Sequence, residues 1–492
     1  MRESGILMHI TSLPAPYGIG TMGKDAYAFV DFLVRAGQRY WQILPLTPTG
    51  YGDSPYQSLG ACAGNHYLID LDRLADEGLL KKEEIQNIPW GSNPARVDFG
   101  AMYAHRMNVL RQAFQRFTPD GAYETFVEQN RNWLEDYALF TALKDTLGGK
   151  PWLEWPEALR LRKADALAEK RRELSDEIRL QYFVQYEFDR QWKALRSYAN
   201  AKGVRIIGDV PIYVPLDSAD VWANPELFQL DESRHPEQVA GCPPDSFTAD
   251  GQLWGNPIYD WKKMAQTHYF WWIQRLTAAG KLYDVIRLDH FRGFESYWSV
   301  PAGDTTARNG KWVKGPGMDF IHTIQQALPN LEFIAEDLGF ITPEVRKLQQ
   351  DSGYPGMKVL EFAFDSREES DYMPHLYPVD SVCYTGTHDN VTLKQWFDEA
   401  APEDVACAKT YLGLNREEGY IRGMIRGCMG SVSRLCVVQM QDYLELGKEA
   451  RMNFPGTLSS ANWTWRAEKG FDSDALAARI YAATKLYGRV GK

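Results

Sequence analysis

The sequence predicts an α/β protein built on a single (β/α)8 TIM barrel. Short apolar runs recur along the 492 residues, and most of them are separated by stretches in which apolar residues have helical spacing. Several of these runs end in an acidic residue, as expected where barrel strands open into a site. The length fits one large barrel with insertions, so we expect one catalytic domain over residues 1–492.

The predicted strands are short apolar runs that end in polar or glycine residues. They cover residues 6–10, 40–44, 204–210, 285–288, 333–335, 357–362, 382–384 and, near the C-terminus, 450–452. Helices are predicted between or after them over residues 24–35, 261–278, 392–444 and 473–486, and from about 343. This alternation predicts parallel strands with helices packed outside them.

Two long connections interrupt the alternation. From about residue 60 to 200 the apolar spacing is helical, which predicts a large, mostly helical insertion after the second strand. The stretch CPPDSFTADGQLWGNPIY, residues 242–259, has too many Pro and Gly residues for a long helix or strand. Since long loops in compact domains are commonly functional, we expect an active-site lid at about 240–260. The chain ends soon after the eighth predicted strand, so we expect no C-terminal β-sandwich.

Composition excludes several classes of partner. The net charge of −11 disfavours nucleic acid, whose phosphates need basic partners. The sequence contains no apolar run long enough to cross a membrane, and its N-terminal run is too short for a signal peptide. The six cysteines form no CxxC pair and have no zinc spacing, which predicts free thiols and a cytoplasmic location. The 16 Trp, 26 Tyr and 22 Phe suit sugar binding as well as a large core.

Acidic residues end four of the predicted strands. They are Asp209, Asp289, Glu336 and Asp389, at the third, fourth, fifth and seventh strands. Because barrel enzymes carry their reactive residues at the C-terminal ends of strands, these acids predict an active site on one rim. The alternative is a cluster of buried salt bridges with Arg287 and Arg292 that only fixes the strand ends.

Neighbouring strands place Asp289 and Glu336 side by side. Two carboxyl groups about 5–5.5 Å apart suit a retaining glycosidic mechanism, with Asp289 as the nucleophile and Glu336 as the acid/base. Arg287 shares a strand face with Asp289 and can keep it ionised. Asp389, with His388, can hold sugar hydroxyls and stabilise positive charge in the transition state. We expect no metal or other cofactor, because His388 has no second histidine close by, and the sequence has no P-loop and no GxGxxG motif directly after a predicted strand.

Several segments together resemble a known family. They are HITSLP, YGIG, GDSPYQ, IIGDVPIYV, GCPPDSFTADGQLWGNPIY, IRLDHFRG, AEDLG, THDN and NFPGT. With these segments the chain resembles, over essentially its whole length, the 4-α-glucanotransferases of the amylomaltase or disproportionating-enzyme type. These form glycoside hydrolase family 77 of the α-amylase clan.

The resemblance implies an activity and its substrates. A segment of an α-1,4-glucan would pass from a donor to the 4-hydroxyl of an acceptor glucan or glucose, through a covalent glycosyl-aspartate. The expected partners are maltooligosaccharides, glucans derived from starch or glycogen, and glucose as an acceptor. Two alternatives remain open, a retaining α-glucan hydrolase and an inactive glucan-binding protein on the same barrel.

The resemblance also assigns roles to individual positions. Asp289 matches the family nucleophile, Glu336 the general acid/base and Asp389 the transition-state stabiliser. The positions that match substrate-binding residues are Tyr56, Ser54, Asp209, Arg287, His388, Asp245, Gln252, Trp254 and Asn462. Of these, Asp245, Gln252 and Trp254 fall on the expected lid over the acceptor side.

Overall fold

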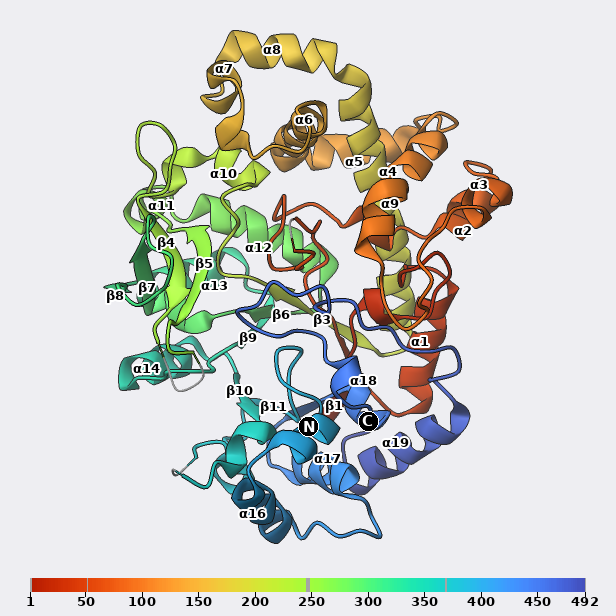
Figure 1. The fold of residues 1–492 in the computed structure, drawn as a ribbon, viewed down its shortest axis with the longest axis vertical. Coiled ribbons are helices and arrows are strands. Elements are labelled where there is room, and N and C mark those ends of the chain that lie inside the picture. The colour runs from red at the N-terminus through yellow and green to blue at the C-terminus, as the bar shows by residue number, and fades with distance from the viewer. Residues whose placement is uncertain (1, 51, 245–247, 368–369, 492) are drawn as a thin grey trace.

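The computed structural model describes residues 2–50, 52–244, 248–367 and 370–491. Eight parallel strands close into a barrel in the order β1-β12-β11-β10-β9-β6-β3-β2, which confirms the predicted fold class (Figure 1). The barrel strands are β1 (Glu3–Leu7), β2 (Tyr40–Gln42), β3 (Arg205–Val210), β6 (Val285–Leu288), β9 (Glu332–Ala335), β10 (Gly356–Val359), β11 (Ser381–Tyr384) and β12 (Leu435–Gln439).

Helices follow most of the strands and cover the barrel. They are α1 (Lys24–Arg35), α10 (Ala219–Ala223), α11 (Trp261–Gln266), α12 (Phe270–Leu282), α13 (Gly317–Ala327), α14 (Pro343–Ser352), α15 (Leu393–Glu399), α16 (Pro402–Leu412), α17 (Tyr420–Gly430), α18 (Met440–Tyr443) and α19 (Asp474–Leu486). Helix α1 has the bounds that its apolar spacing predicts, and it buries Phe29, Val30 and Leu33. None of the described helices is long and apolar enough to span a membrane.

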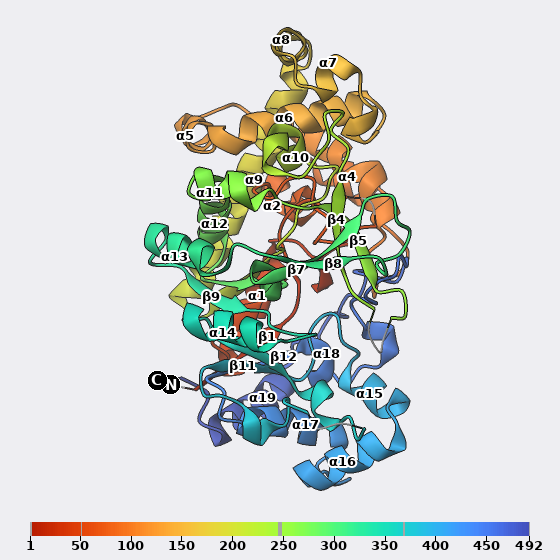
Figure 2. The ribbon, with the colours of Figure 1, turned by 90° about the vertical axis from the view of Figure 1, so that its left-hand side faces the viewer.

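Between β2 and β3 the chain is mostly helical. This part contains α2 (Leu71–Asp76), α3 (Lys82–Gln86), α4 (Phe99–Phe114), α5 (Gly121–Gln129), α6 (Arg131–Thr146), α7 (Glu157–Arg160), α8 (Ala164–Glu173) and α9 (Ser175–Ala201). Helices α5 to α8 lie together at the top of the molecule in both views (Figures 1 and 2). The long helix α9 connects them to the barrel, where the Trp192 indole is buried and donates to the Leu282 carbonyl at 3.0 Å.

The stretch expected to be a lid loop, 240–260, contributes two short strands to a small sheet. Strands β4 (Gln238–Cys242) and β5 (Gln252–Pro257) join β7 (Ser296–Pro301) and β8 (Lys311–Lys314) in the antiparallel order β5-β4-β7-β8. The Pro and Gly content limits these strands to short lengths, but it does not prevent pairing, because Gly255 takes a φ of +77° inside β5. The sheet lies beside the barrel, with β7 and β8 on its outer side (Figure 1).

The prediction of the eighth barrel strand was wrong. Residues 450–452 do not form a strand, and the eighth strand is β12, inside the stretch 392–444 that we predicted to be helical. The residues LCVVQ of β12 are all buried between β1 and β11. Such a fully buried run has no alternating pattern, so spacing alone cannot distinguish it from a buried helix.

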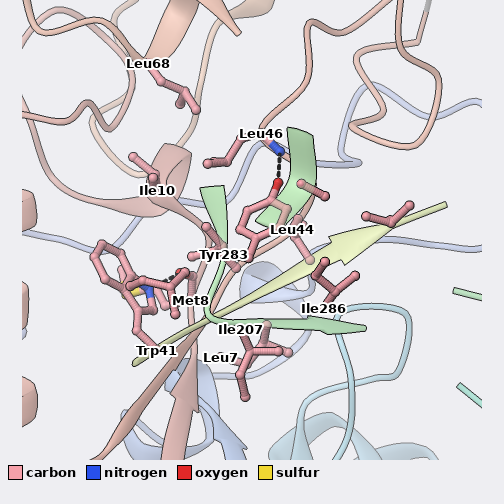
Figure 3. Packing of buried hydrophobic residues seen from close by; sticks show 14 of the residues in the cluster. Leu7, Met8, Ile10, Trp41, Leu44, Leu46, Leu68, Ile207, Tyr283 and Ile286 are labelled. Atoms are coloured by element: carbon pink, nitrogen blue, oxygen red, sulfur yellow. Dashed lines mark hydrogen bonds between the residues drawn. The ribbon is translucent and has the colours of Figure 1, made fainter. Parts of the chain in front are cut away.

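The core lies inside the barrel and between the strands and helices. Figure 3 shows part of it, where Leu7, Met8, Trp41, Ile207 and other residues of the first strands meet. The Trp41 indole donates to the Met8 carbonyl at 2.7 Å, and the Leu46 amide donates to the Tyr283 hydroxyl at 3.1 Å. These bonds satisfy polar groups within an apolar cluster and so hold the strand ends in fixed positions.

Candidate active site

The register between β6 and β9 determines where two of the acids lie. Leu288 pairs with Ala335, so the next residue on each strand, Asp289 and Glu336, follows at the same end of the barrel. His290 then takes the left-handed conformation, with a φ of 51°, and its backbone N–H donates to Glu336 Oε2 at 2.7 Å. Asp289 and Glu336 therefore follow neighbouring strands, and the backbone of the residue after Asp289 is hydrogen-bonded to the Glu336 carboxyl.

Arg287 connects Asp289 to a third acid. Asp209 and Arg287 pair directly across β3 and β6. The Arg287 Nη1 atom donates to Asp209 Oδ2 at 2.6 Å and to Asp289 Oδ1 at 2.9 Å. Burial opposes the charged form of Arg287, but the two carboxylates raise its pKa well above the usual range. Arg287 is therefore a permanent positive charge beneath Asp289, whose side chain is 26 % exposed.

Tyr56 and His388 extend this network to Asp389. The Tyr56 hydroxyl donates to Asp209 Oδ2 at 2.7 Å and lies 2.9 Å from His388 Nε2. The rings of Tyr56 and His388 are stacked, with centroids 5.3 Å apart and planes 14° from parallel. His388 Nε2 in turn lies 3.4 Å from Asp389 Oδ2. Burial lowers the pKa of His388, so its ring is neutral at pH 7 and makes hydrogen bonds rather than an ion pair.

Two residues that sequence reasoning missed hold Asp389 from the other side. Asn453 Nδ2 donates to Asp389 Oδ1 at 2.6 Å. Arg451 donates to the backbone carbonyl of Asp389 at 3.0 Å and to that of Asn453 at 2.8 Å. The NFPGT segment begins at Asn453, but nothing in its sequence shows that the amide reaches a strand end about 60 residues earlier.

The protonation of Glu336 follows from its surroundings. Its side chain is nearly buried, and burial, together with the negative charge of Asp289, raises its pKa to about 8. Arg287 and the backbone amides of His290 and Leu338 act in the opposite direction, with the Leu338 N–H donating to Glu336 Oε1 at 2.9 Å. Glu336 is therefore mostly protonated at pH 7, beside a partly exposed Asp289.

Residues of β5 and of the 453–463 segment lie next to the loops that carry the acids. The Trp254 ring meets His290 edge to face, with centroids 4.9 Å apart, and its indole donates to Gln252 Oε1 at 3.1 Å. A Cβ added to Gly456 would lie 3.9 Å from Gln252 Cγ, so this segment reaches β5. Asp245 lies outside the described residues.

The remaining predicted binding residues contact the backbone. Ser54 Oγ accepts from the Tyr56 amide at 3.2 Å and so supports the turn that presents Tyr56. Asn462 is buried and braces the 454–457 turn, because it accepts from the Phe454 amide and donates to the Thr457 carbonyl, each at 3.1 Å. Sequence reasoning missed Trp463, whose ring centroid lies 5.8 Å from Tyr56 and 6.0 Å from His388.

Two further observations delimit the site. Among the residues that the structure describes, no group of three or more His, Cys, Asp or Glu is arranged to hold a metal ion. A cavity of about 670 Å³ lies at the opposite end of the barrel. It is lined by Glu3, Tyr40, Val285 and Glu332, which are the first residues of β1, β2, β6 and β9. The acids, in contrast, gather at the C-terminal rim. A buried carboxyl with a raised pKa beside a second carboxyl that is paired with an arginine, with Asp389 close by, is an arrangement that suits glycosidic chemistry.

Comparison with known proteins agrees with this geometry. A family model described as 4-alpha-glucanotransferase matches residues 8–472. The chain is 48 % identical to the 4-alpha-glucanotransferase of Clostridium butyricum over 98 % of this chain and 100 % of that protein. It is also 48 % identical to the 4-alpha-glucanotransferase of Thermus thermophilus over 99 % of both chains.

Solved structures give the same result. The amylomaltase from Streptococcus agalactiae in complex with acarbose superposes with a TM-score of 0.97 at 43 % identity, over 99 % of this chain and 100 % of that one. The amylomaltase from Corynebacterium glutamicum shares the fold, with a TM-score of 0.80 at 18 % identity over 98 % of this chain and 75 % of that one. The chain therefore belongs to the 4-alpha-glucanotransferases, glycoside hydrolase family 77, and is a glycosyltransferase that acts on α-glucans.

Proposed function

We propose that the chain transfers glucan segments by a retaining double displacement with Asp289 as the nucleophile. Asp289 attacks the anomeric carbon, so the bond from this carbon to the leaving 4-oxygen breaks and a glycosyl-aspartate ester forms. Glu336 gives its proton to the leaving oxygen. In the second step Glu336 takes the proton of the acceptor 4-hydroxyl, which attacks the ester and restores Asp289.

The observation that carries this proposal is the contrast between the two acids. Arg287 donates to Asp289 Oδ1 at 2.9 Å, and a neighbouring positive charge favours the carboxylate form that a nucleophile requires. Burial and the charge of Asp289 keep Glu336 protonated, which a general acid requires. When the ester forms, Asp289 loses its charge, so the carboxylate of Glu336 is no longer repelled by a neighbouring negative charge. Glu336 therefore gives up its proton in this step and is in the deprotonated form that the second step needs.

Asp389 is our candidate for stabilising the positive charge that develops on the sugar. Its side chain is 44 % exposed, and its oxygens are oriented by Asn453 on one side and His388 on the other. A fixed carboxylate interacts more strongly with a charge that develops in the transition state than with the neutral substrate. Tyr56, which is stacked on His388, offers a ring against the same sugar.

We further propose that β5 and the 453–463 segment favour transfer over hydrolysis. Water and a sugar hydroxyl compete for the same ester, so transfer needs an acceptor site that excludes water and positions the sugar. Trp254 lies against His290, the residue after the nucleophile, and Gln252 fixes its indole. These contacts support an apolar acceptor wall beside the acids.

The finer assignments follow from the same reasoning. We propose maltooligosaccharides and glucans derived from starch or glycogen as donors, and glucose or glucans as acceptors. A cytoplasmic location is supported by the six cysteines, none of which forms a disulfide in the described part of the chain. A retaining α-glucan hydrolase remains the second candidate, because both reactions use the same three acids.

Incubation with maltotriose tests the proposal. Transfer produces glucose and a ladder of longer oligosaccharides while the number of reducing ends stays constant. Hydrolysis raises the number of reducing ends and produces no oligosaccharide longer than the substrate. Chromatography of the products together with a reducing-end assay separates the two outcomes, and reducing ends that rise with every turnover would contradict the transferase mechanism.

A further inference from the structure

A row of apolar side chains lies on the outer face of the four-stranded sheet. The strand register pairs Leu253 with Gly241, Gly241 with Trp298, and Trp298 with Trp312. Directly paired residues of antiparallel strands project from the same face of a sheet. Trp254, the neighbour of Leu253, projects from the opposite face toward His290. The row therefore lies on the face of the sheet opposite to that of Trp254.

Two exposed rings form the end of this row. Trp312 is 37 % exposed and Phe340, from the loop after Glu336, is 67 % exposed. Their planes are 17° from parallel and their centroids are 6.5 Å apart. We call Trp312 and Phe340 the aromatic platform. Trp298, which pairs with Trp312 on the neighbouring strand, supports the platform. The two rings meet edge to face with centroids 5.1 Å apart, and the Trp298 indole donates to the Ala307 carbonyl.

A buried arginine holds the platform in place. The Arg292 guanidinium lies 3.7 Å from the centre of the Trp312 ring and 5.9 Å from that of Phe340. It also donates to the Phe340 carbonyl and, at 3.0 Å, to Ser296 Oγ. The guanidinium is nearly inaccessible to solvent, so the two rings are fixed before any ligand arrives. A site that is ordered in advance loses less entropy on binding.

From this arrangement we infer that the aromatic platform is a second binding site for an α-1,4-glucan chain, outside the catalytic cleft. Ring faces of this kind pack against the apolar faces of sugars. The Arg292 guanidinium, which contacts the Trp312 ring, is itself nearly inaccessible to solvent. The platform is continuous with the catalytic rim, because Arg292 follows Asp289 on one loop and Phe340 follows Glu336 on the next. A chain held there stays next to the cleft that acts on it.

The choice of a glucan as the ligand rests on the proposed function, since a polymer substrate extends beyond the few sugars that one cleft can hold. The other occupant that exposed rings could attract is a second copy of this chain. A glucan chain is favoured because the exposed area is two rings, which is small compared with the surface that a stable protein interface buries.

The test compares Trp312→Ala and Phe340→Ala with the parent protein. Each change should raise the KM for amylose about 3- to 10-fold, as expected for the loss of one ring contact, while kcat and KM for maltotriose stay unchanged. Trp312→Phe, which keeps a ring, should retain most of the affinity. Phe270→Ala is the matched control, because Phe270 is an exposed ring on α12 and not part of the platform.

A second measurement separates binding from turnover. In the Asp289→Asn background, native electrophoresis in a gel that contains amylose should slow the protein, and the two platform variants should reduce this retardation. Equal retardation in all variants, or an equal change in KM for amylose and maltotriose, would overturn the inference. So would self-association that the platform variants abolish without any change in glucan binding. If the parent makes no ladder from maltotriose, the proposed function fails, whereas the gel still reports on the platform.

Discussion

One nitrogen of Arg287, Nη1, donates to Asp209 at 2.6 Å and to Asp289 at 2.9 Å. Asp209 is buried, with 2 % of its surface exposed, whereas Asp289 reaches the solvent at the barrel rim. The buried carboxylate therefore fixes the guanidinium, and the guanidinium fixes the exposed carboxylate. Because the charges of this trio depend on one another, replacing one member changes the other two.

Replacing Arg287 with Met tests this dependence. The change leaves the Asp209 carboxyl buried without its cation, so the free energy of unfolding should fall by about 3–5 kcal/mol, and kcat should fall as well. The double variant Arg287→Met with Asp209→Asn removes the unpaired carboxyl and should regain stability but not activity. Urea denaturation and kcat for maltotriose measure the two effects, and a single variant as stable as the parent would contradict the account.

Replacing Asn453 with Ala removes the amide that orients Asp389. A hydrogen bond to a charged group is worth about 1.5–3 kcal/mol, so kcat should fall about 10- to 100-fold, with little change in KM. The control is Asn309→Ala, because Asn309 donates to Asp304 at 3.1 Å in the exposed connection between β7 and β8 and makes no contact in the network around Asp389. Steady-state kinetics decide the matter, and the same kcat in both variants would remove Asn453 from its positioning role.

The raised pKa of Glu336 predicts how stability depends on pH. In the folded state this pKa is about 8, and in the unfolded chain it is about 4.3, so the folded protein binds the proton more tightly. The stability contributed by protonated Glu336 is fully present below about pH 4.3 and falls as the pH rises, until the loss is complete above about 8. Glu336→Gln has no such loss.

The Tm of Glu336→Gln should therefore exceed that of the parent by a margin that grows from pH 5 to pH 9. Glutamine keeps the size of the side chain and still accepts hydrogen bonds from backbone amides such as that of His290. Thermal unfolding of both proteins across this range is the measurement. A margin that is constant, or that shrinks at high pH, would show that the carboxyl is already ionised near neutrality.

Replacing Trp254 with Ala should shift the enzyme toward hydrolysis. The change opens the acceptor wall beside His290 to water, so the ratio of reducing ends formed to glucan transferred should rise several-fold. Trp254→Phe keeps an apolar ring and should have a smaller effect. Both ratios come from the maltotriose assay, and an unchanged ratio in the alanine variant would mean that other residues exclude water.

The barrel and the positions of the acids could be predicted because they depend on local patterns. Asp209, Asp289 and Glu336 each lie within one residue of the end of a mostly apolar run, and parallel strands all end at one rim of a barrel. The eighth strand could not be predicted, because the buried run of β12 carries no alternation of apolar and polar residues.

Contacts between distant segments account for what sequence reasoning missed. Asn453 reaches Asp389, and Trp463 reaches Tyr56 and His388, only because the chain folds back over the rim after β12. The small sheet was missed because β4 and β7, which pair in it, lie far apart in the sequence. Their pairing depends on the tertiary fold and not on local propensity.

Trapping the covalent intermediate tests the central claim most directly. A fluorinated maltosyl fluoride slows the second step more than the first, so the ester should accumulate and survive digestion. Mass spectrometry should then find one added fluorinated maltosyl group on the peptide that contains Asp289, and no label in the Asp289→Asn variant. A label on Glu336 or on Asp389, or turnover of maltotriose by Asp289→Asn at the parent's rate, would contradict the mechanism.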